Sequence, residues 1–223
     1  MGAGNCDPDS ASKSLQKVHQ FLWSRTLPNG DNTCLKCGSG AGYLTWKDFR
    51  FGSDSIITSF RYPKNKSLID AVFRTLPDYK AFFESYTHKS YTIGGSIIFP
   101  KHRGSINQKR GTNPLISDRW DLTLECIRRF YLGEDSPLYS TLEKDKAFFN
   151  LFMDFKGYVD FFFLQDCVSQ DYSSVKIWLG KGDFKESPLP STVEEYLAWI
   201  ETELAFVEKR NRQITEYIIS RKE

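Results

Sequence analysis

The sequence lacks a long hydrophobic run, and it lacks an excess of charge of either sign. No apolar stretch approaches the roughly 18 residues of a membrane-spanning helix, and the start of the chain, from Met1 to Asp7, has neither the basic nor the apolar region of a secretory signal. The 30 basic and 28 acidic residues nearly cancel, which excludes a histone-like protein and an acidic disordered tail. We therefore expect a soluble, cytoplasmic protein that does not bind a membrane.

Cysteine is scarce and odd in number, with five residues at Cys6, Cys34, Cys37, Cys126 and Cys167. This scatter argues against a disulfide scaffold and favours a reducing compartment. Cys34 and Cys37 have the spacing of a zinc knuckle, but no second such pair exists. Cys6 and His19 could complete a tetrahedral site only if the N-terminus folded back. A structural loop is the favoured interpretation, and zinc binding or redox use of the thiols is the alternative.

The chain has ample material for a folded core. It contains 223 residues, 40% of them hydrophobic, with 18 Phe, 11 Tyr and 5 Trp. This composition excludes a disordered or collagen-like chain. We expect residues 1–10 to be flexible and residues 11–223 to form a single α+β domain. Its small, mostly antiparallel sheet would be packed by several helices, with a long amphipathic helix at about residues 192–220.

Turn and periodicity signals divide the chain into short elements. A helix is expected from Ser12, with one apolar face formed by Leu15, Val18, Phe21 and Leu22. Residues 43–49 and 55–62 are expected to pair as antiparallel strands around a turn at 51–54, and residues 91–99 to form a third strand. In that strand, Gly94-Gly95 indicates a bulge or the close approach of a backbone or ligand. The remaining predictions are helices at 66–87 (broken at Pro77), 117–132 (capped by Ser117 or Asp118), 136–155 and 156–167, a loop at 100–115 and a short fourth strand at 175–179.

The last helix carries the clearest pattern. Ser191 or Thr192, with Glu194 or Glu195 three residues later, forms a capping box. The apolar residues that follow are spaced alternately four and three apart and form one seam, interrupted by a single polar residue: Val193, Leu197, Ile200, Leu204, Val207, Asn211, Ile214 and Ile218. The favoured interpretation is a helix lying along its own domain. A seam to a partner protein or to a second copy is the alternative.

The near-neutral total conceals two charged segments. Residues 89–110 contain five basic side chains, His102 and no acid, whereas residues 134–171 contain eight acids against three lysines. The basic segment mixes cations with amides, which suits phosphate oxygens, although no Walker motif is present. The loop also leads into a helix N-terminus, which favours anions. The candidate phosphate-binding residues are Lys101, Arg103, Asn107, Gln108, Arg110 and Arg119, and the alternative is a solvated basic loop.

Three carboxylates are candidate catalytic groups. Asp121 and Glu125 are one turn apart on a predicted helix, and Arg128 and Arg129 lie one turn further on. Such a pair could bind Mg²⁺ or serve as acid and base, although ordinary salt bridges are favoured. Asp160 lies in an apolar segment beside Lys156, Gln165 and Asp166, and a buried ion pair with Arg119 or Arg128 is the favoured reading.

Several motifs together carry a resemblance: LKCGSG from Leu35, YLTW from Tyr43, GGSIIFPKH from Gly94, SINQKRG from Ser105 and DRWDLTLECIRR from Asp118. Over about residues 35–179 the chain resembles a family of uncharacterised bacterial proteins, a domain of unknown function. The resemblance implies a bacterial origin and one compact unit. It brings no activity, cofactor or catalytic residue with it.

These observations lead to two functional hypotheses. The first is an intracellular bacterial protein that binds a nucleotide or nucleic acid through the region from Lys101 to Arg119. A possible reaction under this hypothesis is ADP-ribosyl transfer. Such enzymes have an Arg, Ser and Glu arrangement that is loosely matched here by Arg25, the segment Ser53-Asp54-Ser55 and Glu125. The second is a non-catalytic interaction or oligomerisation module that uses the seam between Val193 and Ile218. Neither hypothesis assigns a cofactor or a metal.

Overall fold

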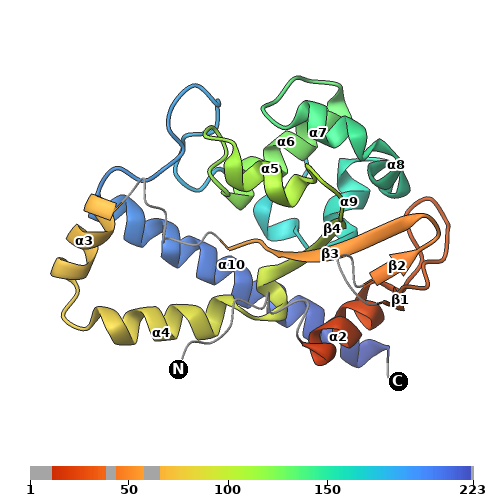
Figure 1. Cartoon of the computed structure of the whole chain (residues 1–223), viewed down its shortest axis with the longest axis horizontal. Coiled ribbons are helices and arrows are strands. Elements are labelled where there is room, and N and C mark those ends of the chain that lie inside the picture. Colours follow the sequence, from red (N-terminus) through yellow and green to blue (C-terminus); the bar gives the residue numbers. More distant parts are fainter. Residues whose placement is uncertain (1–11, 39–43, 58–65, 222–223) are drawn as a thin grey trace.

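A small antiparallel sheet lies at the centre of the protein (Figure 1). The structure is a computed structural model that describes residues 12–38, 44–57 and 66–221. The strands follow one another in sequence order: β1 (Lys36–Cys37), β2 (Leu44–Trp46), β3 (Phe49–Ser55) and β4 (Ser96–Pro100). Every neighbouring pair is antiparallel. The α+β class expected from the sequence is confirmed.

The predicted strand pairing was wrong, because the turn lies elsewhere. β2 turns into β3 at Lys47 and Asp48, where Lys47 has a φ of 50°. Residues 51–54, predicted as the turn, lie within β3 and pair with β4, with Gly52 opposite Phe99 and Asp54 opposite Ile97. The Gly and Asp that suggest a turn therefore have their backbone in a strand ladder. Residues 58–62 of the predicted strand lie outside the described residues.

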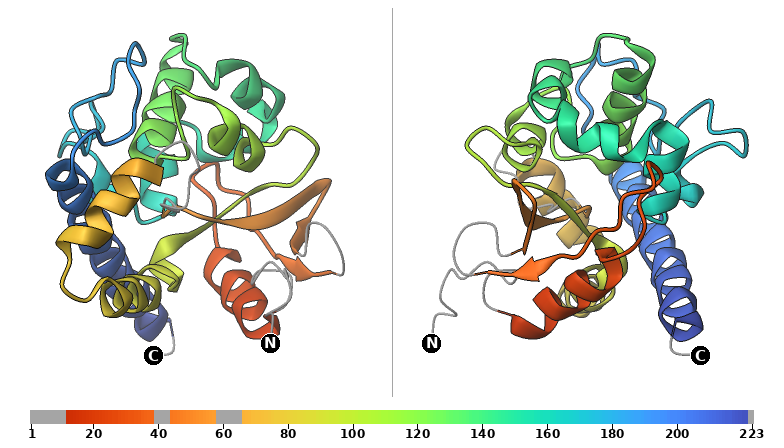
Figure 2. Two further views of the ribbon diagram at one scale, coloured as in Figure 1. Left: turned by 60° about the vertical axis from the view of Figure 1, so that its left-hand side comes forward. Right: turned by 90° about the vertical axis from the view of Figure 1, so that its right-hand side faces the viewer.

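Helices cover both faces of the sheet. Their bounds are α2 (Lys13–Trp23), α3 (Lys66–Thr75), α4 (Tyr79–Ser90), α5 (Ile106–Thr112), α6 (Trp120–Leu132), α7 (Tyr139–Lys144), α8 (Lys146–Phe149), α9 (Phe155–Phe161) and α10 (Val193–Ser220), with short 3₁₀ turns η2 (Ile93–Gly95), η3 (Asn150–Phe152) and η4 (Gln165–Cys167). In Figure 1, α5 to α8 lie above the sheet, and α2, α4 and α10 lie below it. Figure 2 shows the same division from two further directions.

Local signals placed several helix ends correctly. Ser12 caps α2 by accepting a hydrogen bond from the Leu15 amide at 3.2 Å. The predicted break at Pro77 separates α3 from α4. The buried side of α2 was predicted in part: Leu22 is buried as expected, but Val18 and Phe21 are 37% and 41% exposed. Its buried residues are His19, Leu22 and Trp23.

Other boundaries differ from the expectation. The predicted loop at 100–115 contains α5, and the predicted helices at 136–155 and 156–167 are divided into α7, α8, η3, α9 and η4. The residue at the cap position of α6 is Arg119; Ser117 and Asp118, the expected caps, have φ values of 46° and 64°. In place of the fourth strand at 175–179, a single bridge joins Val168 to Val175. The predicted flexible segment 1–10 lies outside the described residues.

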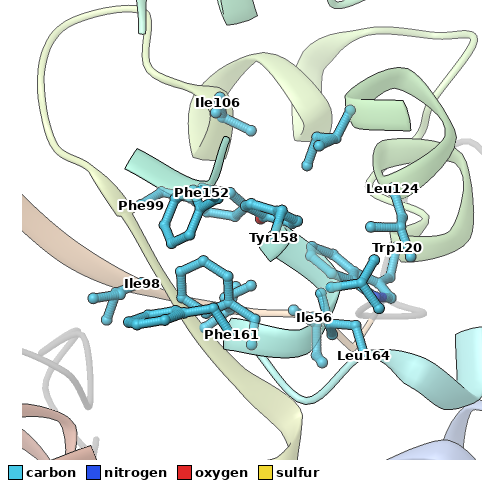
Figure 3. Close-up of a cluster of buried hydrophobic side chains, with 14 of the residues drawn as sticks. Ile56, Ile98, Phe99, Ile106, Trp120, Leu124, Phe152, Tyr158, Phe161 and Leu164 are labelled. Atoms are coloured by element: carbon cyan, nitrogen blue, oxygen red, sulfur yellow. The ribbon is translucent and has the colours of Figure 1, made fainter. Parts of the chain in front are cut away.

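Aromatic and aliphatic side chains from the sheet and from α5, α6 and α9 form the main core (Figure 3). Trp120 and Tyr158 are fully buried at its centre. A second cluster joins α3 and α4 to α10 and consists of Val72, Tyr86, Tyr196, Trp199 and Ile200. No helix in the described ranges is long and apolar enough to cross a membrane.

The C-terminal helix has the predicted cap and a covered seam. Thr192 accepts a hydrogen bond from the Glu195 amide at 3.2 Å, and the Glu195 carboxylate accepts from the Ser191 amide at 2.7 Å. Every residue of the predicted seam is buried or half-buried against the same chain. Asn211, the polar interruption, accepts from the Gly94 amide at 2.7 Å and donates to Thr92 Oγ1 at 2.7 Å. A Cβ at Gly94 would overlap the Val207 carbonyl oxygen, which confirms the expected close approach.

Candidate functional site

A cavity of about 410 Å³ with polar and apolar lining residues opens where β3 and the start of β4 meet η2 and α5. Its size is within the range of about 300–1,000 Å³ that is usual for small-molecule sites. Two of the six predicted phosphate-binding residues, Lys101 and Asn107, line it. The other lining residues are Leu15, Ser53, Asp54, Ser55, Tyr91, Thr92, Ile93, Gly95 and Ser96.

The sheet register and the start of α5 bring these groups together. On β3, Ser53 and Ser55 pair with Ile98 and Ser96 of β4. Lys101 follows β4 directly, and its amide donates to the Arg50 carbonyl at 2.8 Å. Its alkyl chain covers Gly52, where a Cβ would lie 3.0 Å from Lys101 Cδ. Asn107, in the first turn of α5, donates from Nδ2 to the Ser53 carbonyl at 3.4 Å.

Three polar groups of this cavity have no acceptor, donor or counter-charge in the described part of the chain. The hydroxyl of Ser53, a residue that is only 5% exposed, has no hydrogen-bond partner there. The buried Oδ1 of Asn107 has none either. The Lys101 ammonium forms no ion pair with another described residue. An unsatisfied buried polar atom costs about 1–3 kcal/mol of stability. A ligand that formed hydrogen bonds with Ser53 and Asn107 would remove this cost on binding.

Arg110 supports the cavity from behind and is not available to a ligand. It is fully buried, and its Nη1 donates to Asp54 Oδ2 at 3.0 Å and to the Ser55 carbonyl at 2.8 Å. Its Nη2 donates to the Asp118 carbonyl at 2.7 Å, and its Nε to Thr123 Oγ1 at 3.2 Å. The predicted role in phosphate binding is therefore replaced by a structural one, in which Arg110 fixes one wall of the cavity.

His19 supports the cavity from the other side, which the sequence analysis did not find. Its Nδ1 accepts from the Trp23 indole at 2.9 Å, and its Nε2 lies 3.2 Å from the hydroxyl of Ser96 in the cavity lining. Burial, together with the positive charge of Arg210, lowers the pKa of His19 to about 3. The ring is neutral and holds its proton on Nε2, which makes it a fixed donor to Ser96.

Arg119 and Asp121 form a sealed ion pair away from the cavity lining. Both side chains have no exposed surface. Arg119 Nε donates to Asp121 Oδ1 at 3.0 Å and its Nη1 to the Pro188 carbonyl at 2.7 Å, while Asp121 Oδ2 accepts from the Trp178 amide at 2.9 Å. The pair therefore fastens the irregular segment between Trp178 and Pro188 to the start of α6.

Glu125, the second catalytic candidate, is held by two arginines. Arg128 binds its carboxylate through Nε at 2.8 Å and Nη2 at 2.9 Å, and Arg129 binds through Nε at 2.8 Å. Burial on its own raises the pKa of Glu125, but the hydrogen bonds from Arg128 and Arg129 outweigh it and the pKa is lowered. This is the salt-bridge arrangement that the sequence favoured.

Asp160 has different partners from those predicted. It pairs with Lys156, and its Oδ1 accepts from Gln165 Nε2 at 3.0 Å and from the Tyr172 hydroxyl at 2.7 Å. The expected ion pair with Arg119 or Arg128 was wrong, because those guanidinium groups hold Asp121 and Glu125. Each of the three candidate carboxylates thus sits among its own partners, and none lines the cavity.

The remaining predicted residues lie at the surface. Arg103 and Gln108 are exposed, and Gln108 Oε1 accepts from the Gly104 amide at 2.7 Å. One contact between the basic and acidic segments was missed by the sequence analysis: His102 Nε2 lies 2.8 Å from Asp145 Oδ1, within hydrogen-bond distance. Two cations of the basic segment pair with acids outside the acidic segment: Arg110 with Asp54 and Asp118, and Lys89 with Glu208.

Cys34 and Cys37 do not belong to a cluster of metal-binding side chains in the described part of the chain. Cys34 and Cys37 are exposed, and Cys37 donates from Sγ to Gln20 Oε1 at 3.2 Å. No group of three or more metal-binding side chains occurs within residues 12–38, 44–57 and 66–221. His19, one of the two residues that could have completed a zinc site, contacts Trp23 and Ser96 instead. Cys6 lies outside the described residues.

Comparison with known proteins gives a family but no activity. No curated protein and no solved structure matches the chain. The match to a family covers residues 2–214, nearly the whole sequence. The chain belongs to DUF6994, a family of unknown function.

Proposed function

We propose that this protein binds a nucleotide, or another small ligand carrying a phosphate group, in the cavity between β3, η2 and α5. The observation that carries the proposal is that three groups meet on one cavity. The Lys101 ammonium forms no ion pair with another described residue, and the Ser53 hydroxyl and the Asn107 side-chain oxygen are buried without a hydrogen-bond partner there. An ammonium acts as a point charge for phosphate, whereas hydroxyl and amide groups suit ribose or base edges.

The shape of the site favours a nucleotide over a nucleic-acid strand. A backbone-binding surface presents a row of cations along an open groove. Here one lysine lines a cavity of about 410 Å³, and Arg110 and Arg119 are enclosed by their own partners. A single phosphate group at Lys101 is what these charges can accommodate.

ADP-ribosyl transfer receives less support than binding alone. Of the three elements that suggested it, Ser53-Asp54-Ser55 lines the cavity. Arg25 lies against the rings of Phe161 and Phe163, and Glu125 is held by arginines. NAD is therefore included among the ligands to be tested, with release of nicotinamide as the sign of a reaction.

The second hypothesis, docking through the seam of α10, is supported less well because the same chain covers the seam. Self-association through it would require the helix to leave its own core. The cytoplasmic setting remains part of the proposal. It is supported by the unpaired thiols of Cys34, Cys37, Cys126 and Cys167.

The test is equilibrium binding of AMP, ATP and NAD, with short RNA and DNA strands as competitors, at two salt concentrations. Lys101→Ala should weaken nucleotide binding about tenfold or more, since a charge-assisted hydrogen bond contributes about 1.5–3 kcal/mol. Lys109→Ala is the matched control, because Lys109 is exposed on α5 and does not line the cavity. Equal loss in both variants, or no binding by the parent protein, would show the proposal to be wrong.

A further inference from the structure

A second cavity is lined in part by Arg25, which pairs with no carboxylate of residues 12–38, 44–57 and 66–221. Arg25 follows α2, and Thr33 fixes its backbone: the Arg25 amide donates to Thr33 Oγ1 at 2.8 Å, and the Thr33 amide donates to the Arg25 carbonyl at 3.1 Å. The guanidinium carbon lies 4.2 Å from the ring centre of Phe161, 4.6 Å from that of Phe163 and 4.9 Å from that of Tyr217. Arg25 is thus a cation enclosed by aromatic rings.

The hydrogen-bonding edge of this guanidinium is unused. Nε and Nη2 of Arg25 are buried and have no hydrogen-bond partner in the described ranges. In two other arginines the same two nitrogens bind a carboxylate: Arg128 binds Glu125 in this way, and Arg119 binds Asp121. Side-on binding through Nε and Nη2 is thus how Arg119 and Arg128 pair with their carboxylates. In Arg25 the same two nitrogens have no hydrogen-bond partner among the described residues.

The cavity itself has an apolar lining with two basic side chains. It measures about 420 Å³, and its walls include Arg25, Leu27, Pro28, Phe152, Met153 and Lys156. Two acids also border it, but both have other partners. Asp160 is held by Lys156, Gln165 and Tyr172, and Asp154 Oδ1 accepts from the Gly157 amide at 2.7 Å. The four formal charges of the lining cancel in sum, but within the described residues the Arg25 guanidinium forms no ion pair with a carboxylate, whereas Lys156 pairs with Asp160.

Two residues at or beside the same cavity, Met153 and Phe163, have a positive φ. Phe163, whose ring covers Arg25, has a φ of 56°, a left-handed conformation that a bulky residue rarely adopts. Met153 has a φ of 68° and a ψ of −55°, and the Asp154 amide closes a tight turn by donating to the Phe152 carbonyl at 2.8 Å. Met153 is 67% exposed, so the core does not explain its strain. Strained positions of this kind cluster at ligand sites.

We propose that this cavity binds a carboxylate carried on an apolar body, with Arg25 as the receptor of the carboxylate. The two oxygens would take the Nε and Nη2 hydrogens, and the apolar part would lie against Leu27, Pro28 and Phe152. Because both nitrogens are covered in this structure, binding requires a small rotation of the guanidinium toward the cavity that it lines. The site is separate from the Lys101 cavity and shares no lining residue with it.

The probe is benzoate, compared with benzamide, its neutral counterpart of the same shape, and with inorganic phosphate. Binding is followed through the indole signal of Trp23 in two-dimensional NMR, because its ring centre lies 5.7 Å from the Arg25 guanidinium carbon. We expect benzoate to shift this signal in a saturable way and benzamide to bind at least about tenfold more weakly. Equal binding of the two probes, or binding of phosphate without benzoate, would overturn the carboxylate assignment.

Variants then identify the receptor. Arg25→Lys keeps the positive charge but removes the paired Nε and Nη2 donors. Its affinity for benzoate should be at least about tenfold lower. Arg25→Met should lose binding altogether; if it does not fold, Arg25→Lys decides the question. Arg212→Met is the matched control, because Arg212 is exposed on α10 and lines neither cavity. Benzoate affinity that is unchanged in Arg25→Lys would refute the proposal, whereas Lys101→Ala should leave it unaffected.

Discussion

The buried His19 should make the protein sensitive to mild acid. In the folded chain its pKa is lowered to about 3 by burial and by the charge of Arg210, whereas the unfolded chain has the usual value of about 6.5. Below pH 6.5 the unfolded state therefore binds a proton that the folded state does not. The stability contributed by a neutral His19 is complete above this pH and is lost as the pH falls from about 6.5 toward 3.

The magnitude follows from the two pKa values. Each pH unit within this window costs about 1.4 kcal/mol, so His19 alone should remove about 2 kcal/mol of unfolding free energy between pH 7 and pH 5. His19→Asn removes the titrating group and keeps an acceptor for the Trp23 indole, which donates to Nδ1 at 2.9 Å. The variant should be less stable at pH 7, because it loses packing and the contact with Ser96.

The assay is urea unfolding at pH 7, 6 and 5, followed by tryptophan fluorescence and circular dichroism. Carboxylates and other histidines titrate in both proteins, so the informative quantity is the difference between the parent and His19→Asn. We expect this difference to shrink by about 2 kcal/mol on going from pH 7 to pH 5. Parallel curves, in which the difference changes by less than about 0.5 kcal/mol, would mean that His19 is not held neutral.

Two further substitutions test the packing that positions the site. Arg119→Ala should destabilise the fold by about 3–5 kcal/mol in urea unfolding, because it leaves Asp121 charged, buried and unpaired. The double variant with Asp121→Leu should recover part of this loss, and a purely additive result would contradict the ion-pair account. Gly94→Ala should cost about 1–3 kcal/mol, because the new Cβ meets the Val207 carbonyl, which α10 holds in place. Gly111→Ala is the control, because a Cβ built at Gly111 in α5 would lie 3.9 Å from its nearest neighbour, Asp118 Oδ1. This variant should be neutral or stabilise the fold by up to about 1 kcal/mol. Equal losses of stability in the two glycine variants would refute the steric argument.

Elements defined by local signals were the most predictable. Ser12, Pro77 and Thr192 act on backbone groups within four residues of themselves, so the sequence around them suffices to place α2, the α3–α4 break and the start of α10. Strand pairing depends on partners far away in the chain. Gly52 to Asp54 resemble a turn locally, and only β4, more than forty residues later, makes them a strand.

The candidate site was predictable in part for the same reason. Lys101 and Asn107 lie on the cavity as the basic segment suggested. Arg110, in the same segment, turns away from the ligand side because Asp54 and Asp118 provide its counter-charges. A run of charge along the sequence shows how many cations are present, but not which of them the fold neutralises. That assignment depends on acids brought together by the sheet and by the left-handed residues before α6.

The three arginines that are fully buried in the described part of the chain suggest a common physical reason for this division of roles. Arg110, Arg119 and Arg210 each donate to backbone carbonyls of irregular segments or strand ends, including Ser55, Pro188 and Gly94. Carbonyls outside regular structure have no ladder partner, and a guanidinium offers five donors in a fixed plane to satisfy them. A lysine ammonium is more strongly hydrated, and burying it in this way would cost more. These arginines therefore hold the backbone in place. Lys101, which follows β4, is the cation that lines the cavity between β3, η2 and α5, and we propose that it binds the phosphate.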